Sequence, residues 1–399
     1  MLDRLKISGF KSIKNLCESS DKGFRLMDVN LLIGGNGAGK SNLIEFFKML
    51  RAMMGMRLAE FRDLKPSLAR FLDNKGGIHN FLHGGVQTTK EILGELIFNN
   101  SKNGYRVSII PTADGSYSIG KEEFYYDGFY KPGYWKTEYN NSGTPYKESL
   151  LPTLYQKAVE EKAQTRYQYI YEAIQSWQIY QFHDTSQFAG ARMPSLINSG
   201  DELHFDGGNV AAFLYKMKNG ELYGSKMHQD CIDAYGNIVD MIRVAAPYFD
   251  DFILDPYKEG DDERVKLQWR QIDSLMKFQP HHLSDGTLRF ICLSAVLLQP
   301  KPPQLVIIDE PELGLHPEAL EALAELIHLC KAKTQFLLAT QSPSFADFFK
   351  PSEIVTVTRN NGESIFERQS EEKLSAWLEQ YSIGQLWRKN IIRGGITNG

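Results

Sequence analysis

The chain has 399 residues, of which 42% are hydrophobic and 24% are charged, and its formal net charge is −4. This length and composition allow one large hydrophobic core or two moderate ones. The slightly acidic balance argues against a strongly basic nucleic-acid binder, although it leaves room for a local basic patch.

The cysteines and the apolar runs restrict where the protein works. Cys17, Cys231, Cys292 and Cys330 are scattered, with neither metal-ligand spacing nor the pattern of a disulfide framework. We expect them to be buried thiols in a reducing compartment. Apolar runs stay well short of the roughly 18 residues that span a membrane, and the start carries no apolar signal core. We therefore expect a cytoplasmic protein that does not enter a membrane.

The N-terminal part predicts a strand, a glycine loop and a helix in succession. Residues 2–7 and 24–33 are apolar and read as strands, the second of which ends at Gly34-Gly35. A helix is expected from Ser41, because apolar residues then recur with helical spacing.

The next part has a different pattern. Residues 92–127 predict antiparallel strands, with hairpin turns at Asn103-Gly104 and Asp114-Gly115. Residues 128–148 are rich in Gly, Pro, Tyr and Asn, and predict an exposed loop.

Helices are expected in the middle of the chain, at 150–181, 209–218 and 226–246. From residue 284 onward, helices and strands alternate in the manner of a parallel α/β structure. The elements expected there are helices at 284–298, 317–329 and 371–380, and strands at 304–308, 335–339, 353–358 and 363–368.

The segment Gly34 to Ser41 fits the P-loop pattern G-x-x-x-x-G-K-[ST] at every fixed position, between a strand and a helix. Glycines let backbone N–H groups converge on phosphate oxygens at a helix N-terminus. Lys40 would place its charge beside the β and γ phosphates, and the Ser41 hydroxyl would ligate Mg²⁺. The residues expected to bind nucleotide here are Gly34, Asn36, Gly37, Ala38, Gly39, Lys40, Ser41 and Asn42.

A second motif follows the apolar strand that begins near Gln304. Asp309 and Glu310 stand at its carboxyl end, where ligands gather in parallel sheets. With the P-loop, they predict a Walker B motif in which Asp309 helps to hold Mg²⁺ and Glu310 polarises the attacking water.

A third motif is the string Leu-Ser-Asp-Gly at 283–286. Ser284 and Gly286 can direct a hydroxyl and a backbone N–H at an anion, with the helix dipole in support. On its own this string is more typical of a helix N-cap; its place before the Walker B strand favours a nucleotide role.

The order of these motifs, followed by Ala-Thr-Gln-Ser-Pro at 339–343, resembles the ABC ATPase class. More narrowly, the chain is similar to the RecF/SMC-like AAA ATPases of bacteria, which often lie beside phage-defence genes and include the PARIS-type and Septu-type ATPases. The strings that carry this narrower resemblance are Gly-Phe-Lys-Ser at 9–12, Phe-His-Asp-Thr-Ser at 182–186, Asp-Glu-Pro-Glu-Leu-Gly-Leu-His-Pro at 309–317 and Ile-Gly-Gln-Leu-Trp at 383–387.

The resemblance implies a head-to-tail dimer or a higher homo-oligomer that sandwiches ATP and Mg²⁺. Ser284 and Gly286 of one copy would contact the γ-phosphate held by the other, and His316 would lie near the partner. Gln341 stands where many ABC proteins carry a switch histidine, so we expect a hydrogen-bonding role in catalysis. The coupling glutamine of the class has no obvious counterpart; His79 and Asn80 lie in the matching region.

Other polar groups favour structural roles. The spacing of His183, Asp184, His204 and Asp206 fits no metal site, and His281-His282 is expected in a loop. The aromatic residues at 167–180 favour helix packing over base stacking. For Arg4 and Lys11 we expect surface solvation rather than contact with nucleotide or DNA.

The fold expected is α/β: an ABC-type ATPase head with a P-loop parallel sheet core, an antiparallel β subdomain and a helical insertion. The corresponding parts are 1–91 and 263–399 for the head, 92–149 for the antiparallel region and 150–262 for the insertion.

The function expected is that of an ATP-hydrolysing switch that regulates a separately encoded effector, such as a nuclease of TOPRIM or HNH type, in phage defence. The sequence carries no nuclease motif of its own. Alternatives are an ATPase that clamps DNA in repair and a scaffold that binds ATP without turnover. A transporter subunit is disfavoured by the long insertion and by Asp285, where transporters carry glycine.

Overall fold

In a computed structural model, the chain divides into two units, each with its own sheet and helices. Unit 1 comprises Met1–Trp177 and Lys350–Gly399, and unit 2 comprises Gln178–Phe349. The structure describes residues 1–16, 23–56, 58, 66–128, 131–138, 145–163, 165–224 and 227–393. The Cys17 thiol, part of the sequence-based expectation for buried cysteines, lies outside these residues.

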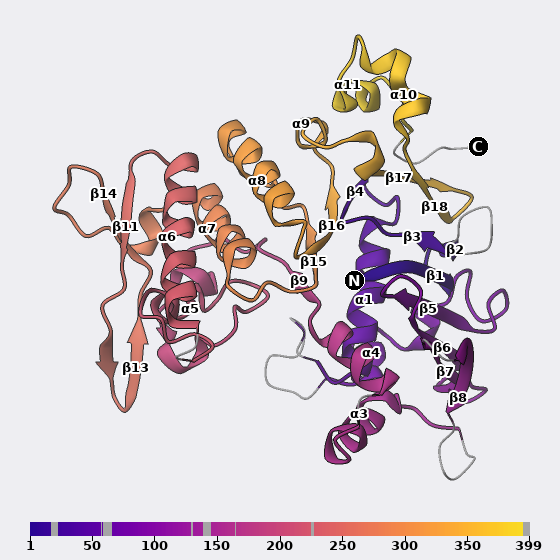
Figure 1. Ribbon diagram of the computed structural model, residues 1–399. Helices are drawn as coiled ribbons and strands as arrows, with labels where there is room; N and C mark the ends of the chain where they lie inside the picture. Colours follow the sequence, from indigo (N-terminus) through magenta and orange to yellow (C-terminus); the bar gives the residue numbers. More distant parts are fainter. Residues whose placement is uncertain are drawn as a thin grey trace. The chain divides into compact units, whose positions relative to one another are not determined.

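Unit 1 contains an antiparallel sheet in the order β2-β1-β5-β6-β7-β8, with β3 paired to β1 (Figure 1). Its strands are β1 (Leu2–Phe10), β2 (Ile13–Leu16), β3 (Phe24–Arg25), β5 (Ile92–Phe98), β6 (Asn103–Pro111), β7 (Tyr117–Gly128) and β8 (Lys131–Glu138). Along β5, buried and half-buried residues alternate, as expected for a strand with one face on a core. The antiparallel strands predicted for 92–127 are thereby confirmed.

Two details of this sheet differ from the sequence-based expectation. The turn after β5 lies at Asn99–Lys102, where Asn99, Asn100 and Ser101 have positive φ, and Asn103-Gly104 begins the next strand. Among residues other than glycine, Asn enters this region most readily, and two of the three residues here are Asn. The turn therefore lies before the predicted Asn-Gly dipeptide. Residues 131–138 form β8 rather than a loop, because their backbone pairs with β7.

A second set of strands in unit 1 carries the P-loop. β4 (Val29–Ile33) pairs in parallel with β17 (Ile354–Asn360), which pairs antiparallel with β18 (Glu363–Arg368). The single strand expected over 24–33 is therefore divided into β3 and β4. The division follows from a local turn, in which the Asn30 side chain accepts from the Met27 N–H at 2.9 Å and donates to the Met27 carbonyl at 2.7 Å.

The helices of unit 1 agree with the sequence-based predictions only in part. They are α1 (Lys40–Met53), α2 (Leu68–Asp73), α3 (Leu151–Glu160), α4 (Arg166–Gln175), α10 (Glu371–Leu378) and α11 (Ile383–Arg388). The helix expected over 150–181 breaks between α3 and α4, where Lys162 has a φ of 51°. Its end is the strand β9 (Gln178–Tyr180) of unit 2. The last helix, α11, was not expected; Ser382 caps it through the Gln385 N–H.

An aromatic cluster forms the core of unit 1. Phe47 of α1 meets Trp177 edge to face, with ring centroids 5.2 Å apart, and Trp177 stacks on Phe98 of β5 at 6.2 Å. Phe10 and Phe46 extend the cluster toward β1. All five rings are 1% exposed or less, and each such side chain contributes about 1.5–3 kcal/mol by burial. This cluster fixes α1, and hence the P-loop before it, on the antiparallel sheet.

Unit 2 contains a parallel sheet in the order β16-β15-β9, with two small antiparallel sheets. The remaining strands are β10 (Ser195–Leu196), β11 (Phe249–Ile253), β12 (Tyr257–Glu259), β13 (Asp262–Val265), β14 (Gln268–Gln271), β15 (Leu305–Asp309) and β16 (Gln335–Thr340). Its helices are α5 (Val210–Lys218), α6 (His228–Ala245), α7 (Asp285–Leu298), α8 (Pro317–Cys330) and α9 (Pro343–Ala346). Helices α6, α7 and α8 pack against one another (Figure 1).

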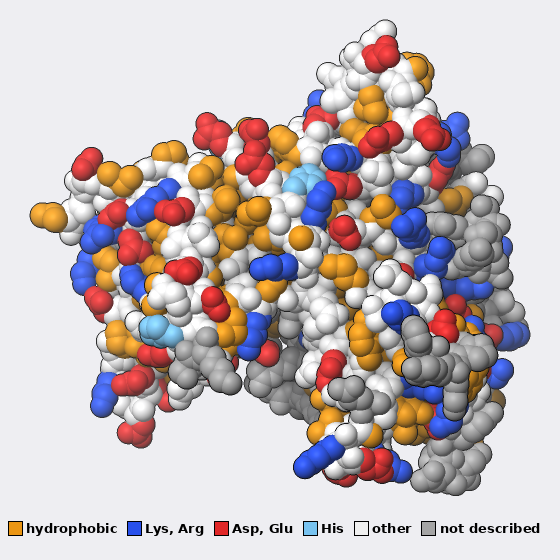
Figure 2. Space-filling view, in the orientation of Figure 1, with side chains coloured by type: hydrophobic (Ala, Val, Ile, Leu, Met, Phe, Trp, Pro, Cys, Tyr) orange, Lys and Arg blue, Asp and Glu red, His pale blue; other side chains and the backbone are white. Residues whose placement is uncertain are grey.

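Helix α8 illustrates how this layer separates apolar from charged residues. Leu323, Leu326 and Ile327 are buried, whereas Glu321 and Glu325 are exposed. Figure 2 shows acidic side chains gathered over this helix. The face of α8 that meets solvent therefore repels rather than attracts a polyanion.

The structure tests the predictions made for the cysteines and for membrane-spanning helices. Cys231 and Cys292 are buried, and burial raises the pKa of the Cys292 thiol to about 12. Among the residues that the structure describes, no helix combines the length and apolar character that crossing a bilayer requires.

A buried carboxyl in β7 generates a prediction on pH and stability. Glu122 is 0% exposed, and burial raises its pKa, although hydrogen bonds from Ser149, Tyr105 and the Leu150 N–H act in the opposite direction. Because the folded pKa lies above the unfolded one, the favourable contribution of Glu122 is complete below the unfolded pKa and is lost as pH rises through the folded pKa. Each pH unit that separates the two pKa values is worth about 1.4 kcal/mol.

We expect the free energy of unfolding of the wild type to fall, relative to Glu122→Gln, as pH rises above the unfolded value of a carboxyl. Urea unfolding at several pH values measures this difference. Glu160→Gln, on the exposed part of α3, is the matched control and should show no such trend. Parallel pH curves for wild type and Glu122→Gln would contradict a raised pKa.

Candidate active site

The P-loop lies between β4 and α1 of unit 1, and two of its glycines have conformations that other residues resist. Gly37 and Gly39 have φ of 76° and 114°. A Cβ on Gly39 would lie 2.0 Å from the Ser364 Oγ and 2.8 Å from the Ser12 Oγ. A Cβ on Gly34 would lie 2.5 Å from the Val357 carbonyl oxygen. The backbone conformation thus requires glycine at positions 37 and 39, and the lack of space requires it at positions 34 and 39.

The Lys40 ammonium lies against the backbone of the same loop. Its side chain is buried at 6% exposure, and Nζ donates to the carbonyl oxygens of Gly34 at 2.5 Å and Gly35 at 3.2 Å. Asn36 and Gly37 are exposed, and so is Ser41 in the first turn of α1. A helix N-terminus with no acidic residue in its first turn, beside a buried cation, offers the charges that a phosphate group needs.

A buried hydroxyl network supports the loop from below. The Ser12 and Ser364 hydroxyls are 2.6 Å apart, and Ser364 Oγ donates to the Ala38 carbonyl at 2.6 Å. Asn42 Nδ2 donates to Ser12 Oγ at 2.6 Å. The Asn42 amide thus ties α1 to Ser12, and the nucleotide contact expected of Asn42 stays a prediction. This network gives the Gly-Phe-Lys-Ser string a structural meaning, and Ser364 was missed because nothing near it in sequence marks it.

Lys11 is not simply solvated. Its Nζ pairs with the Glu45 carboxylate of α1, which also meets Lys75 Nζ at 2.6 Å. Burial raises the pKa of Glu45, but the two ammonium groups outweigh this effect and leave the pKa below its ordinary value. The expectation of surface solvation for Lys11 was therefore wrong: the residue anchors β1 to α1.

Unit 2 places Glu310 directly after the Walker B strand in an unusual conformation. β15 is buried up to Ile308, and Glu310 has a φ of 50°. A residue other than glycine in this region costs on the order of 1 kcal/mol or more, and such strain concentrates at functional sites. The Glu310 N–H donates to the Ala339 carbonyl at 2.8 Å, which holds the turn against β16.

Gln341 contacts the Glu310 side chain. Its Nε2 donates to Glu310 Oε1, and the two residues follow neighbouring parallel strands, β16 and β15. The structure therefore brings together these two residues predicted for catalysis, and it does so inside unit 2.

The Leu-Ser-Asp-Gly string at 283–286, called the signature from here on, lies at the start of α7. Ser284 is the N-cap, and its Oγ accepts from the Thr287 N–H at 3.1 Å; the contact with nucleotide expected of Ser284 stays a prediction. A Cβ on Gly286 would lie 2.2 Å from the Gly314 carbonyl oxygen. Gly286 thus lets the loop after the Walker B motif approach α7 closely.

Two arginines that the sequence did not single out hold this region together. Arg289, 5% exposed, donates through Nε to the Phe182 carbonyl at 2.7 Å and through Nη1 to the Leu313 carbonyl. Burial lowers its pKa, as desolvation of a cation must. Helix α7, the Phe-His-Asp segment and the loop after β15 therefore share one buried guanidinium.

Arg192 joins the same segment to the signature. Its Nη1 donates to the carbonyls of Pro280 at 2.7 Å and Leu283 at 3.0 Å, and its Nε to Thr185 at 3.0 Å. Nη2 also pairs with Asp285, but that carboxylate is 64% exposed, so the pair contributes at most about 1 kcal/mol. The position of Arg192 is therefore set mainly by its hydrogen bonds to the three backbone carbonyls.

The remaining candidates have local roles. Asp184 and Asp206 accept from the N–H groups of Ser186 and Gly208, two residues on. Asn80 closes a turn onto the Lys75 carbonyl at 2.8 Å. Across the described part of the chain, no three His, Cys, Asp or Glu side chains are placed to hold a metal ion by themselves.

The aromatic residues at 167–180 pack within the fold. Tyr171 stacks on Tyr155 with ring centroids 4.2 Å apart, and Tyr167 donates to Glu138. Tyr180 stacks on Phe182 at 5.4 Å. His281 and His282 were expected in a loop and lie in a short 3-10 helix, Pro280–His282, in which His282 Nδ1 accepts from the Gln279 N–H at 3.0 Å. Packing was the favoured interpretation of the aromatic residues, and these contacts confirm it.

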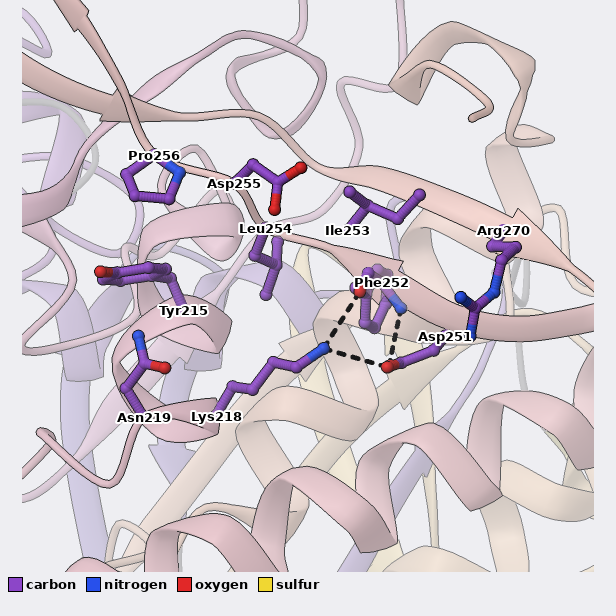
Figure 3. Close-up of a pocket in the computed structure, with 10 residues that line it drawn as sticks. All are labelled: Tyr215, Lys218, Asn219, Asp251, Phe252, Ile253, Leu254, Asp255, Pro256 and Arg270. Carbon is purple, nitrogen blue, oxygen red and sulfur yellow. Dashed lines mark hydrogen bonds and ion pairs between the residues drawn. The ribbon is translucent and has the colours of Figure 1, made fainter. Parts of the chain in front are cut away.

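A surface pocket of about 480 Å³ in unit 2 lies among residues of α5, β11 and β14 (Figure 3). Its charged groups already pair: Lys218 Nζ lies 3.0 Å from Asp251, and Arg270 lies 2.5 Å from Asp250. None of the motif residues lines it. The pocket therefore offers little charge to a ligand and does not compete with the motifs as a candidate active site.

Comparison with known proteins agrees with the motifs and the fold. The family described as "AAA domain, putative AbiEii toxin, Type IV TA system" matches residues 29–150 and 220–347, and these segments contain the P-loop, the signature, Asp309, Glu310 and Gln341. No curated protein matches the sequence significantly. Since the matched segments make up more than half of the chain, the chain belongs to this AAA family.

Solved structures of SMC heads share the fold. An Smc head bound to the C-winged helix domain of ScpA has 14% sequence identity and a TM-score of 0.56, and the match covers 93% of this chain and 99% of that one. An Smc head domain with an extended coiled coil, bound to the C-terminal domain of ScpA from Pyrococcus furiosus, has 15% identity, a TM-score of 0.52 and coverage of 95% and 98%. At these identities the likeness establishes the fold of an SMC-type ATPase head.

Proposed function

We propose that this member of the AAA family is a Mg²⁺-dependent ATPase that works as a nucleotide-driven switch. The observation that carries the proposal is the P-loop itself, in which glycines at positive φ and the buried Lys40 ammonium form a cradle for phosphate. Ser41 and Asp309 would hold Mg²⁺, whose charge neutralises the phosphate oxygens. The donor set fits, since a hydroxyl and a carboxylate are oxygen ligands of the kind Mg²⁺ prefers.

The chain's own contribution to hydrolysis is to orient water. Glu310 is held by its strained backbone and by the Gln341 amide, so its carboxylate has a fixed direction. A fixed carboxylate can accept a hydrogen bond from water in line with a γ-phosphate, and catalysis at such sites is mostly positioning and electrostatics. A glutamine amide cannot take up a proton, so Gln341 acts by hydrogen bonding alone.

We further propose that two copies meet head to tail, so that Ser284 and Gly286 of one complete the ATP site of the other, with His316 near the partner. If ATP is 100-fold above its dissociation constant, each site stabilises the closed state by about 2.7 kcal/mol. Two sites together approach the roughly 10⁴-fold bias that swings a two-state equilibrium almost completely. ATP occupancy would then decide whether the dimer is closed.

The partner we propose is a separately encoded effector, with a nuclease of TOPRIM or HNH type as the best fit. Support for the effector comes from the resemblance to phage-defence ATPases. The family description, which names an AbiEii toxin and a type IV toxin–antitoxin system, supports a place in a system of more than one protein. A DNA clamp is the alternative, but the solvent face of α8 is acidic (Figure 2). A second alternative is a scaffold that binds ATP with little turnover. It is supported by Gln341, which stands where many ABC proteins carry a histidine.

The first prediction tests catalysis. Glu310→Gln should bind ATP but hydrolyse it about 10²–10⁴-fold more slowly, because the amide lacks the charge and basicity of the carboxylate. Calorimetry gives the affinity, phosphate release gives the rate, and sedimentation should show a heavier ATP-bound species. Glu318→Gln, exposed in the first turn of α8, is the neutral control, and Lys40→Ala should lose binding. If Glu310→Gln hydrolyses ATP within about threefold of the wild-type rate, Glu310 is not the catalytic residue, and the scaffold interpretation replaces the switch.

The second prediction tests the head-to-tail arrangement. Ser284→Arg should bind ATP but not hydrolyse it, because bulk and charge would obstruct the contact in trans. Mixed with Lys40→Ala chains, it should regain activity, up to one composite site per dimer. Ser370→Arg removes a comparable serine N-cap from α10 and should leave activity unchanged. Normal hydrolysis by Ser284→Arg alone would rule out the arrangement.

The third prediction tests the effector. A tagged chain carrying Glu310→Gln, expressed in its native host, should retain a second protein in an ATP-dependent manner, because the closed form accumulates. Mass spectrometry of the purified complex identifies it. Recovery of the ATPase alone, with and without ATP, would count against a dedicated effector.

A further inference from the structure

Glu312, two residues after Glu310, makes contacts that no catalytic motif accounts for. Its Oε1 accepts from the Thr340 hydroxyl and from the Gln341 N–H at 3.3 Å. Thr340 is fully buried, and its Oγ1 accepts in turn from the Ser342 N–H at 2.9 Å. One carboxyl oxygen therefore fixes the backbone of the segment that follows β16.

The second carboxyl oxygen has no comparable role. Glu312 Oε2 is buried and has no hydrogen-bond partner among the described residues. Burial raises the pKa of Glu312, the Thr340 hydroxyl acts against this, and the charge of Glu310 adds to it. Burying a carboxyl with one oxygen unsatisfied is unfavourable.

The same contacts place Gln341 between the two acids. Glu312 holds the Gln341 backbone, while the Gln341 side chain donates to Glu310 Oε1. A shift of the 340–342 backbone would therefore move the amide that orients the Glu310 carboxylate. Misplacement of a catalytic group by about 1 Å can cost on the order of 10²-fold in rate.

We propose that Glu312 is a positioning residue for ATP hydrolysis, which acts through the Gln341 backbone to fix the direction of the Glu310 carboxylate. The proposal rests on the function proposed above, in which Glu310 orients water. It requires no contact between Glu312 and nucleotide. Glu312 should therefore affect kcat and leave ATP binding almost unchanged.

The test is a double-mutant cycle on the full chain with Glu312→Ala, Gln341→Ala and the double variant, measured by steady-state hydrolysis. Glu312→Ala should lower kcat by about 10- to 100-fold, with KM for ATP within about threefold of wild type. In the Gln341→Ala background the same substitution should change kcat by less than about threefold, because coupled residues are not additive. Effects that multiply would overturn the proposal.

Conservative variants separate positioning from folding. Glu312→Gln keeps the shape and the Oε1 acceptor, and should stay within about threefold of wild-type kcat. Glu312→Asp draws the acceptor back by one methylene group and should lose activity as Glu312→Ala does. If Glu312→Ala does not fold, this pair decides, and equal loss in both would contradict an acceptor role. Should Glu310→Gln remain active, the proposed function fails; should it be inactive while Glu312→Ala is normal, only this inference fails.

Discussion

The Ser12 and Ser364 hydroxyls occupy the space that any side chain at position 39 would need. A Cβ there would lie 2.0 Å from Ser364 Oγ, so the glycine is fixed by packing as well as by its φ of 114°. Since Ser364 also holds the Ala38 carbonyl and Asn42 holds Ser12, the loop cannot open without exposing buried hydroxyls. The position of Lys40 relative to the loop carbonyls depends on this constraint, and so does any phosphate site formed there.

Unit 2 uses buried charge for a similar purpose. Arg289 gathers carbonyls from two loops onto α7, and burial lowers the pKa of its guanidinium as a result. Burying an ionisable group is unfavourable unless its hydrogen bonds compensate. Removing one partner of a buried charge therefore destabilises a protein more than replacing the charge and its partners by apolar groups. The arginine therefore makes the signature helix, the Phe-His-Asp segment and the loop after β15 a single element. A change at one of them cannot leave the others in place.

The strain at Glu310 fits this arrangement. The φ of 50° is maintained because the Glu310 N–H donates to the Ala339 carbonyl and the Glu310 side chain accepts from Gln341. The turn at the end of β15 is therefore held by β16 and the residue that follows it. Strain of this kind persists only where the surrounding structure over-determines it. The same parallel strand pair thus supplies the acid, the amide beside it and the second carboxyl, Glu312, that fixes the amide's backbone.

The sequence determined those features whose residues are contiguous. The P-loop, the Walker B strand and the strand–loop–helix context could be predicted because each is a short string whose chemistry is local, and the apolar periods located most helices and strands. Local signals misplaced the turn at Asn103-Gly104 and missed β8, because strand pairing with β7 outweighed a composition typical of loops. The tertiary structure alone decided the contacts of Ser364, which meets Ser12 from the far end of the chain, and those of Arg289 and Glu312. A serine, an arginine or a glutamate carries no sign of its partner in sequence, since hydrogen-bond partners are chosen by proximity in the folded chain.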